Sequence, residues 1–138
     1  MADKLAKEFA GSWNFVSGEN FEEYMKECGV GLITRKLAAN LKPVLEFVIE
    51  DGKWTMTSTS TFKTHVVKFE IGAEFNDKTA DGRDVKSTFF VEGDKLIQQE
   101  IGLKGGKDSR FERYIEDGKL KIVCECNGVK STRIYERA

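Results

Sequence analysis

Pairs of residues that end in glycine recur along the last two thirds of this 138-residue chain and divide it into short segments. Four pairs are Asp-Gly or Asn-Gly, at positions 51–52, 81–82, 117–118 and 127–128. These dipeptides favour two-residue β-hairpin turns, because both central residues of such a turn need positive φ. The segments between the pairs alternate apolar and polar side chains, which is the period of a half-buried strand. The clearest are 53–59, 63–71, 83–91, 95–101 and 119–126.

About ten antiparallel strands fit into a chain of this length, which is enough for one domain. Consecutive hairpins form a meander, and a long meander either splits into two sheets or closes on itself to remove its exposed edges. We predict an all-β fold, a ten-stranded up-and-down antiparallel β-barrel, as a single domain spanning residues 1–138.

One stretch, residues 20–42, has the period of a helix instead. Apolar side chains recur at helical spacing in two short stripes, Phe21–Cys28 and Leu32–Leu41. Asn20 stands where a cap would begin the first helix, and Pro43, the single proline, ends the second. We expect a helix-turn-helix lid here. Residues 1–10 predict only a short helical turn or a loose arm.

Composition excludes several functional classes. The chain has 22 basic and 23 acidic residues and a formal charge of −1, so no overall field attracts nucleic acid. Its three cysteines are an odd number and no apolar run opens the chain, which favours a reduced, cytoplasmic protein. Cys124 and Cys126 share one strand without partner ligands, so we expect no metal and no cofactor. No run approaches the ~20 apolar residues of a membrane helix, and a monomer is expected.

The strand faces that are expected to point into the barrel contain charged residues. Alternation puts Arg113 on one face with Phe111 and Ile115, and Arg133 on one face with Tyr135. On an ordinary half-buried strand the Arg133 face would point to solvent. Inside a barrel, an arginine is costly unless an anion or a hydrogen-bonding group meets it. A mixed interior suits a ligand cavity better than a packed core. The other inward sets are Arg83, Val85, Ser87 and Phe89, then Leu96, Gln98 and Glu100, and then Leu120, Ile122, Cys124 and Cys126.

Several motifs in fixed order, from Gly11 to the end of the chain, are similar to those of the intracellular fatty-acid-binding proteins, with the closest match in their adipocyte, heart and myelin branch. The motifs are Gly11-x-Trp13, Glu19-Asn20-Phe21, Tyr24-Met25-Lys26, Gly29-Val30-Gly31, Thr34-Arg35-Lys36, Ser60-Thr61-Phe62-Lys63, Glu74-Phe75, Thr79-Ala80-Asp81-Gly82-Arg83 and Ser131-Thr132-Arg133-Ile134-Tyr135-Glu136-Arg137.

The resemblance implies a β-clam, a ten-stranded barrel capped by two helices, which carries one long-chain fatty acid or related lipid in an internal cavity. It also implies a carboxylate-binding trio of Arg113, Arg133 and Tyr135. The cavity and portal residues that it implies are Phe21, Met25, Thr34, Ala38, Pro43, Phe62, Ala80, Asp81, Arg83, Gln98, Glu100, Ile122 and Cys124.

The chain departs from the family pattern at four places. About five additional N-terminal residues and a slightly longer loop at 104–108 are expected to be surface variation. Gly102 stands where many relatives have a bulky aromatic residue and is expected to widen the end of its strand. Glu100 replaces an uncharged polar residue, and if it points inward it should form an ion pair with Arg113.

The function expected from these observations is non-covalent binding and transport of a fatty acid, without catalysis. A retinoid-type carrier, a pure interaction module and a cysteine-dependent enzyme remain as alternatives, the last using Cys124 as nucleophile and His65 as base. Nuclear entry is also compatible with the chain. Transient contact with anionic membranes is expected from basic residues on the lid, namely Lys26, Arg35, Lys36 and Lys42.

Overall fold

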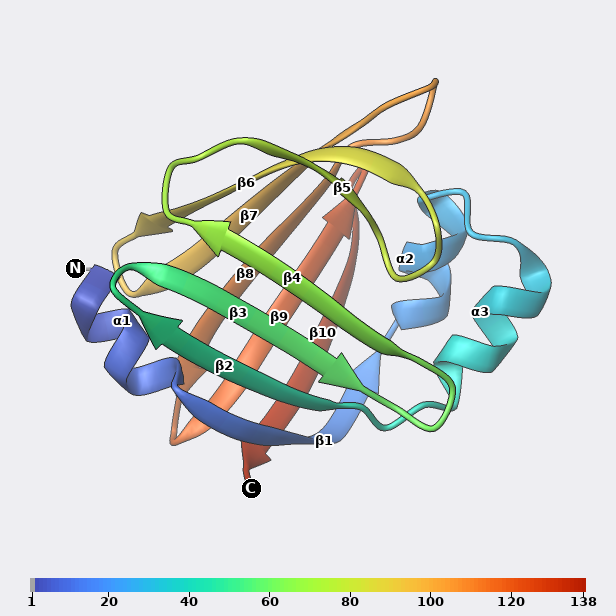
Figure 1. Cartoon of the computed structure of the whole chain (residues 1–138). Coiled ribbons are helices and arrows are strands. Elements are labelled where there is room, and N and C mark those ends of the chain that lie inside the picture. The colour runs from blue at the N-terminus through green and yellow to red at the C-terminus, as the bar shows by residue number, and fades with distance from the viewer. Residues whose placement is uncertain (1) are drawn as a thin grey trace.

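The computed structural model describes residues 2–138 and contains ten strands and three short helices (Figure 1). The helices are α1 (Ala2–Phe9), α2 (Phe21–Glu27) and α3 (Leu32–Ala39). The strands are β1 (Gly11–Glu19), β2 (Val44–Glu50), β3 (Lys53–Thr59), β4 (Thr64–Glu70), β5 (Phe75–Lys78), β6 (Asp84–Glu92), β7 (Lys95–Gly102), β8 (Ser109–Glu116), β9 (Lys119–Cys126) and β10 (Val129–Arg137).

All ten strands belong to one antiparallel sheet that curls into a barrel (Figure 1). The order across the sheet is β4-β3-β2-β1-β10-β9-β8-β7-β6-β5, so the first and last strands of the chain pair with each other. The predicted ten-stranded antiparallel barrel is confirmed. Its closure is incomplete, because within the described residues β4 and β5 share no backbone ladder although they follow each other in the chain.

Three of the four predicted hairpin turns have the expected backbone. Both residues of the pairs at 51–52, 117–118 and 127–128 have positive φ, as a two-residue turn of this type requires. The prediction was wrong for Asp81-Gly82, where only the glycine has positive φ. This pair lies in a longer connection between β5 and β6 and contributes side-chain contacts to the cavity rim described below.

Helix α1 is part of the barrel core, which corrects the expectation of surface variation at the N-terminus. Leu5 and Phe9, one helical turn apart, are both buried. The Phe9 ring packs edge-on against Trp54, with centroids 6.2 Å apart, and its carbonyl accepts a 2.9 Å hydrogen bond from Trp13 Nε1. Arg137 donates to the carbonyls of Glu8 and Ala10 at the end of α1. Figure 1 shows α1 at the end of the barrel opposite α2 and α3.

Gly102 does not widen the barrel as expected. A Cβ atom at this position would collide with the backbone of Gly106, because the loop after β7 folds back across the strand end. The Gly102 amide also donates a 2.9 Å hydrogen bond to Asp108 Oδ1. Glycine at 102 therefore permits close approach between strand and loop.

Candidate ligand-binding cavity

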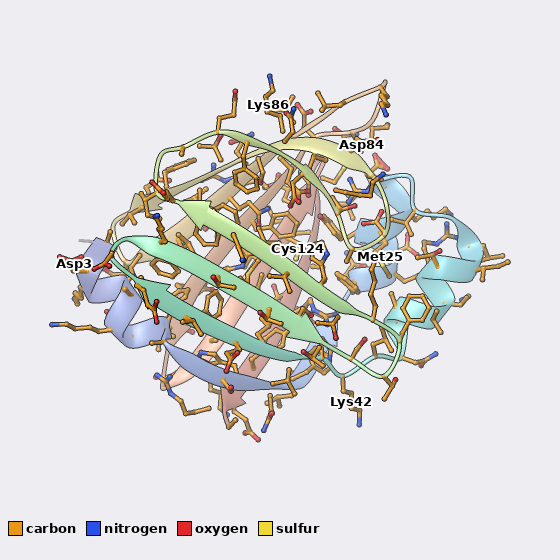
Figure 2. The ribbon with its side chains drawn as sticks, in the orientation of Figure 1. Asp3, Met25, Lys42, Asp84, Lys86 and Cys124 are labelled. Carbon is orange, nitrogen blue, oxygen red and sulfur yellow. The ribbon has the colours of Figure 1, made fainter. Side chains whose placement is uncertain are left out.

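A cavity of about 290 Å³ lies between the barrel walls and the lid. Figure 2 shows Cys124 within the barrel and Met25 at its lid end, whereas Lys42 and Lys86 point outward. All the residues that the sequence analysis assigned to the site lie around this one cavity. They are Phe21, Met25, Thr34, Ala38, Pro43, Phe62, Ala80, Asp81, Arg83, Gln98, Glu100, Arg113, Ile122, Cys124, Arg133 and Tyr135.

Arg133 and Tyr135 are brought together by the alternation of β10. Both side chains are buried, and Arg133 Nε donates a long, 3.5 Å hydrogen bond to Tyr135 Oη. The guanidinium carbon of Arg133 lies 4.1 Å from the centroid of the Phe21 ring and 4.5 Å from that of Phe15. These aromatic faces stabilise a cation without neutralising it. Within the described chain no carboxylate forms an ion pair with Arg133, so its charge is available to a ligand.

Arg113 lies further along the same inner wall. The register places Arg113 opposite Ile122 and Ile122 opposite Arg133, which separates the backbones of the two arginines by two strand spacings, roughly 10 Å. The Arg113 guanidinium lies 5.1 Å from the Phe111 ring centroid and 5.6 Å from that of Phe89. Burial lowers the pKa of Arg113. Both arginine side chains therefore face one cavity, and both lie near Cys124.

Glu100 points into the cavity but does not form the expected ion pair with Arg113. The register places Glu100 opposite Ser109, whereas Arg113 lies opposite Leu96, four residues away along β7. Glu100 instead accepts a 3.3 Å hydrogen bond from Gln98 Nε2. Burial raises the pKa of Glu100 to about 7, and the more distant Arg83 and Arg113 only partly oppose this.

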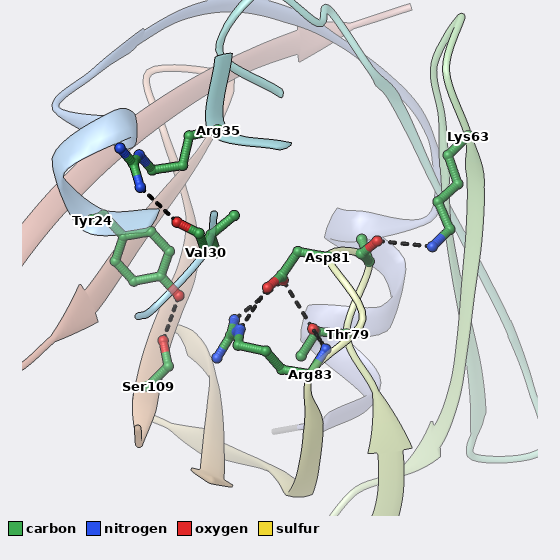
Figure 3. A network of polar contacts seen from close by, with 9 residues as sticks. Tyr24, Val30, Arg35, Lys63, Thr79, Asp81, Arg83 and Ser109 are labelled. Atoms are coloured by element: carbon green, nitrogen blue, oxygen red, sulfur yellow. Dashed lines mark hydrogen bonds and ion pairs between the residues drawn. The ribbon is translucent and has the colours of Figure 1, made fainter. Parts of the chain in front are cut away.

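The connection between β5 and β6 forms part of the cavity rim (Figure 3). Arg83 Nε donates to Asp81 Oδ2 at 2.6 Å, and Thr79 Oγ1 donates to Asp81 Oδ1 at 2.9 Å. Burial would lower the pKa of Arg83, but the hydrogen bond to Asp81 and the negative charges around it, that of Asp81 first, together outweigh burial and raise that pKa. Lys63 Nζ donates a 2.8 Å hydrogen bond to the carbonyl of Ala80, which links the β3–β4 turn to this rim. That contact links the two edges of the sheet, near the place where β4 and β5 share no backbone ladder.

The two lid helices differ in how firmly they are held. The Tyr24 and Ser109 hydroxyls are hydrogen-bonded, which fixes α2 to β8 (Figure 3). Asn20 does not cap α2 through its side chain as expected, because its Nδ2 donates to the carbonyl of Lys130 at 2.8 Å. Helix α3 has no buried residue, and its apolar stripe is exposed, with Ile33 85% accessible.

The basic patch expected on the lid is smaller than the sequence indicates. Lys36 forms a 2.9 Å ion pair with Glu22, and Arg35 donates a 2.7 Å hydrogen bond to the carbonyl of Val30. Lys26 and Lys42 have no ion-pair partner among residues 2–138. Two of the four basic side chains are thus already engaged within the lid.

Seven polar cavity residues were missed by the sequence analysis, namely Tyr24, Ser58, Ser60, Lys63, His65, Asp77 and Thr79. Alternation in β4 could have found His65, because it shares a face with the buried Val67 and Phe69. Burial lowers the pKa of His65. Asp77 had no such signal, because β5 is only four residues long and its strand period was not recognised.

The structure does not favour the cysteine-dependent enzyme. Burial raises the pKa of the Cys124 thiol to about 12, which is opposite to what an activated nucleophile needs. Within the described residues no hydrogen bond connects Cys124 with His65. Over residues 2–138, no group of three or more potential ligands could hold a metal ion. No helix in this range is sufficiently long and apolar to span a bilayer.

Comparison with known proteins places these features in a family. The model of the lipocalin / cytosolic fatty-acid binding protein family matches residues 10–138. Fatty acid-binding protein homolog 6 of Caenorhabditis elegans is 46% identical over 134 residues, covering 96% of this chain and 99% of the relative. The adipocyte fatty acid-binding protein of Pygoscelis papua is 41% identical over 134 residues, covering 97% of this chain and 100% of the relative.

The fold of this chain also matches that of a solved structure. The Schistosoma mansoni fatty acid binding protein in complex with arachidonic acid has a TM-score of 0.91 and 30% identity to this chain. The superposition covers 97% of this chain and 98% of that protein. The chain therefore belongs to the lipocalin / cytosolic fatty-acid binding protein family.

Proposed function

We propose that this protein binds one long-chain fatty acid non-covalently inside the barrel and carries it within the cell. The observation that carries the proposal is the unpaired, buried Arg133 beside Tyr135 at the wall of an otherwise largely apolar cavity. The cavity volume of about 290 Å³ is near the lower end of ligand sites, roughly 300–1,000 Å³. The relatives named fatty acid-binding proteins support the same ligand class.

The chemistry required is binding without bond cleavage. The ligand carboxylate accepts charge-assisted hydrogen bonds from the Arg133 guanidinium and a further one from the Tyr135 hydroxyl. These bonds offset the loss of water around the carboxylate. Arg113 completes the trio as a second positive charge that acts on the carboxylate directly or through ordered water. The alkyl chain is stabilised by about 25 cal/mol for each Å² removed from water.

The head-group assignment is tested by removing the charge of Arg133. Arg133→Gln should weaken a fatty acid by roughly 1.5–3 kcal/mol, or about 10- to 150-fold, because a charge-assisted hydrogen bond is lost. The corresponding fatty alcohol, which has no carboxylate, should bind almost equally to both proteins. Tyr135→Phe should act in the same direction with a smaller loss. Titration calorimetry of the acid and the alcohol measures each effect.

Arg110→Gln is the matched control, because Arg110 lies in β8 and its ion pairs with Glu92 and Glu112 are on the barrel surface. It should leave the acid affinity unchanged. Equal losses for acid and alcohol in Arg133→Gln would show that Arg133 supports the fold and does not bind the carboxylate.

Transient contact with anionic membranes is a further part of the proposal. Its support is the exposed apolar edge of α3, formed by Leu32 and Ile33, together with Lys26 and Lys42 on the same lid segment. Apolar side chains insert at a membrane interface, and nearby basic residues add attraction to anionic lipid. A carrier that exchanges lipid with membranes would need such contact only briefly.

A further inference from the structure

Two of the three cysteines, Cys28 and Cys126, lie where the lid meets the barrel. Cys28 directly follows the last residue of α2, and Cys126 is the last residue of β9. Helix α2 packs against β9 and β10. Both cysteines are free thiols, 2% and 1% exposed. Neither lines the ligand cavity, so the proposed function gives this pair no role.

Hydrogen bonds hold the two thiols side by side. Asn127 Nδ2 donates to Glu27 Oε1 at 3.4 Å, which joins the residue after Cys126 to the residue before Cys28. The side chains of Cys28 and Cys126 are also hydrogen-bonded to each other. Burial, and then this hydrogen bond, raises the pKa of Cys126 to about 12. Two thiols in hydrogen-bond contact need only a small movement to reach the ~2.05 Å length of a disulfide bond.

Cys124 is a poor partner for Cys126. It lies two residues earlier on the same face of β9, so the two Cβ atoms are about 6.6 Å apart, twice the rise of a strand residue. A disulfide needs about 3.8 Å between Cβ atoms. Cys124 also lines the ligand cavity inside the barrel. Cys28 and Cys126 are therefore the pair that the fold prepares for a bond.

Only a thin cover separates this pair from solvent. The residues that follow the two cysteines, Gly29 and Asn127, are exposed. The Cys28 amide donates to the Tyr24 carbonyl at 3.0 Å and so closes the last turn of α2. The end of a helix opens locally at much lower cost than the strands of a barrel. A small, uncharged oxidant such as hydrogen peroxide can therefore reach the thiols while the barrel stays folded.

We propose that Cys28 and Cys126 form a reversible disulfide when the protein meets a peroxide, and that this bond fastens the end of α2 to the β9–β10 turn. One thiol, as its thiolate, attacks a peroxide oxygen. The O–O bond breaks, which leaves a cysteine sulfenic acid and a hydroxide ion that takes up the released proton. The other thiol attacks the sulfenic sulfur, the S–S bond forms and water leaves. The two thiols lose two electrons and two protons in total, and hydrogen peroxide is reduced to two waters.

The bond would restrain the lid at its connection to the barrel. Cys28 begins the segment that joins α2 to α3, so a covalent link at Cys28 holds the end of α2 in place. A disulfide that closes a loop of most of the chain also restricts the unfolded state, which stabilises the fold. Neither effect needs a ligand, so the proposal stands apart from the carrier function.

The test treats the intact, ligand-free protein with excess hydrogen peroxide and maps its peptides by mass spectrometry without reduction. The peptides that contain Cys28 and Cys126 should be recovered joined, and dithiothreitol should separate them. Hydrogen exchange of residues 21–31 should slow several-fold in the oxidised protein. Its melting temperature should rise by ~5 °C or more, and reduction should reverse both changes.

Cys126→Ser should remove the link and both of its effects. Cys124→Ser is the matched control, because it keeps the pair and should respond to peroxide as the wild-type protein does. Oxidation of methionines is common to all three proteins and cancels in the comparison.

The proposal is overturned if Cys28 and Cys126 remain free thiols under peroxide, or if Cys124 or a second molecule supplies the partner. It is equally overturned if the linked protein melts no higher than the reduced one, because the bond would then distort the fold. These measurements use no lipid, so failure of the protein to bind a fatty acid would leave their result unchanged.

Discussion

Glu100 lies on the inner wall of β7 with two arginines in its surroundings and an ion pair with neither. Arg83 is occupied by Asp81, and Arg113 faces Leu96 across the ladder. The Glu100 carboxylate is thus buried with one hydrogen bond from Gln98 and only distant positive charge. The carboxylates of Asp77 and Asp81 further disfavour its ionised form. These conditions raise its pKa from the usual 4.5 to about 7.

This pKa predicts how the stability of the protein depends on pH. Between pH 4.5 and 7 the folded protein binds more protons at Glu100 than the unfolded chain, so stability should fall as the pH rises. The loss is complete above about pH 7 and amounts to roughly 3 kcal/mol. Glu100→Gln should abolish it and unfold at higher urea concentration than the wild-type protein at pH 8.

Urea denaturation of both proteins from pH 4.5 to 8 measures the effect. Other titrating groups, including His65 with its lowered pKa, are common to both proteins and cancel in the difference. A difference in the free energy of unfolding that does not change with pH would mean that Glu100 titrates normally. The same result would contradict the burial described for its carboxylate.

At the scale of elements, the lid consists of one helix anchored to the barrel and one held mainly by surface contacts, among them the Lys36–Glu22 ion pair to the first helix. Helix α2 is held by the Tyr24–Ser109 hydrogen bond, and Asn20 just before it is bonded to the Lys130 carbonyl. Helix α3 buries none of its side chains. A helix of eight residues is too short to be stable alone, so α3 depends on its neighbours. The lid should therefore open at α3 while α2 stays on the barrel.

The exposed edge of α3 predicts a role in lipid transfer. Ile33→Ser should slow transfer of a fluorescent fatty acid to anionic vesicles several-fold, because a large exposed apolar side chain no longer inserts at the membrane surface. The melting temperature should hardly change, since Ile33 is 85% exposed. Stopped-flow fluorescence with phosphatidylserine vesicles measures the transfer rate.

Ile101→Ser is the comparison for Ile33→Ser, because Ile101 is an exposed isoleucine on β7, outside the lid. It should leave transfer unchanged. Transfer that slows equally in both variants, or in neither, would exclude a specific contact through α3.

At the scale of the whole molecule, the sequence predicted the inner and outer faces of the strands better than their register. Alternation correctly placed Leu120, Ile122, Cys124 and Cys126 inward, because burial of one face requires a period of two. It could not show that Glu100 lies opposite Ser109, because that pairing depends on the loop at 103–108. The helical period of 32–41 was correct, but periodicity does not reveal what covers an apolar stripe.

The burial of the N-terminal helix was not predicted, for a different reason. Leu5 and Phe9 have the spacing of one helical turn, which was a usable signal in the sequence. Ten residues are too few for this pattern alone to predict a buried helix. The burial of Phe9 depends on its packing against Trp54 in the barrel, which the sequence does not show. The position of the ligand cavity depends on strand faces, register and helix contacts together.

The order of strands in the sheet differs from their order in the chain at two places. β1 and β10, at opposite ends of the chain, are paired, and the Ala138 amide donates to the Ser12 carbonyl at 2.9 Å. β4 and β5, adjacent in the chain, share no ladder. A circular permutant could therefore join the old termini through a linker that spans α1, about 12 Å long, and begin at Glu74.

In that permutant every neighbouring pair of strands would also be consecutive in the chain, so the pairing of β1 with β10 would no longer require closure of a loop of nearly the whole chain. The pairing of β1 with β10 then joins residues that are close in the sequence, which lowers the contact order. We therefore expect faster refolding to the same barrel. Stopped-flow refolding of both forms would show this, and slower refolding of the permutant would mean that the β1–β10 seam does not limit folding. The native order of strands thus places a covalent connection between β4 and β5, where the described sheet has no backbone ladder.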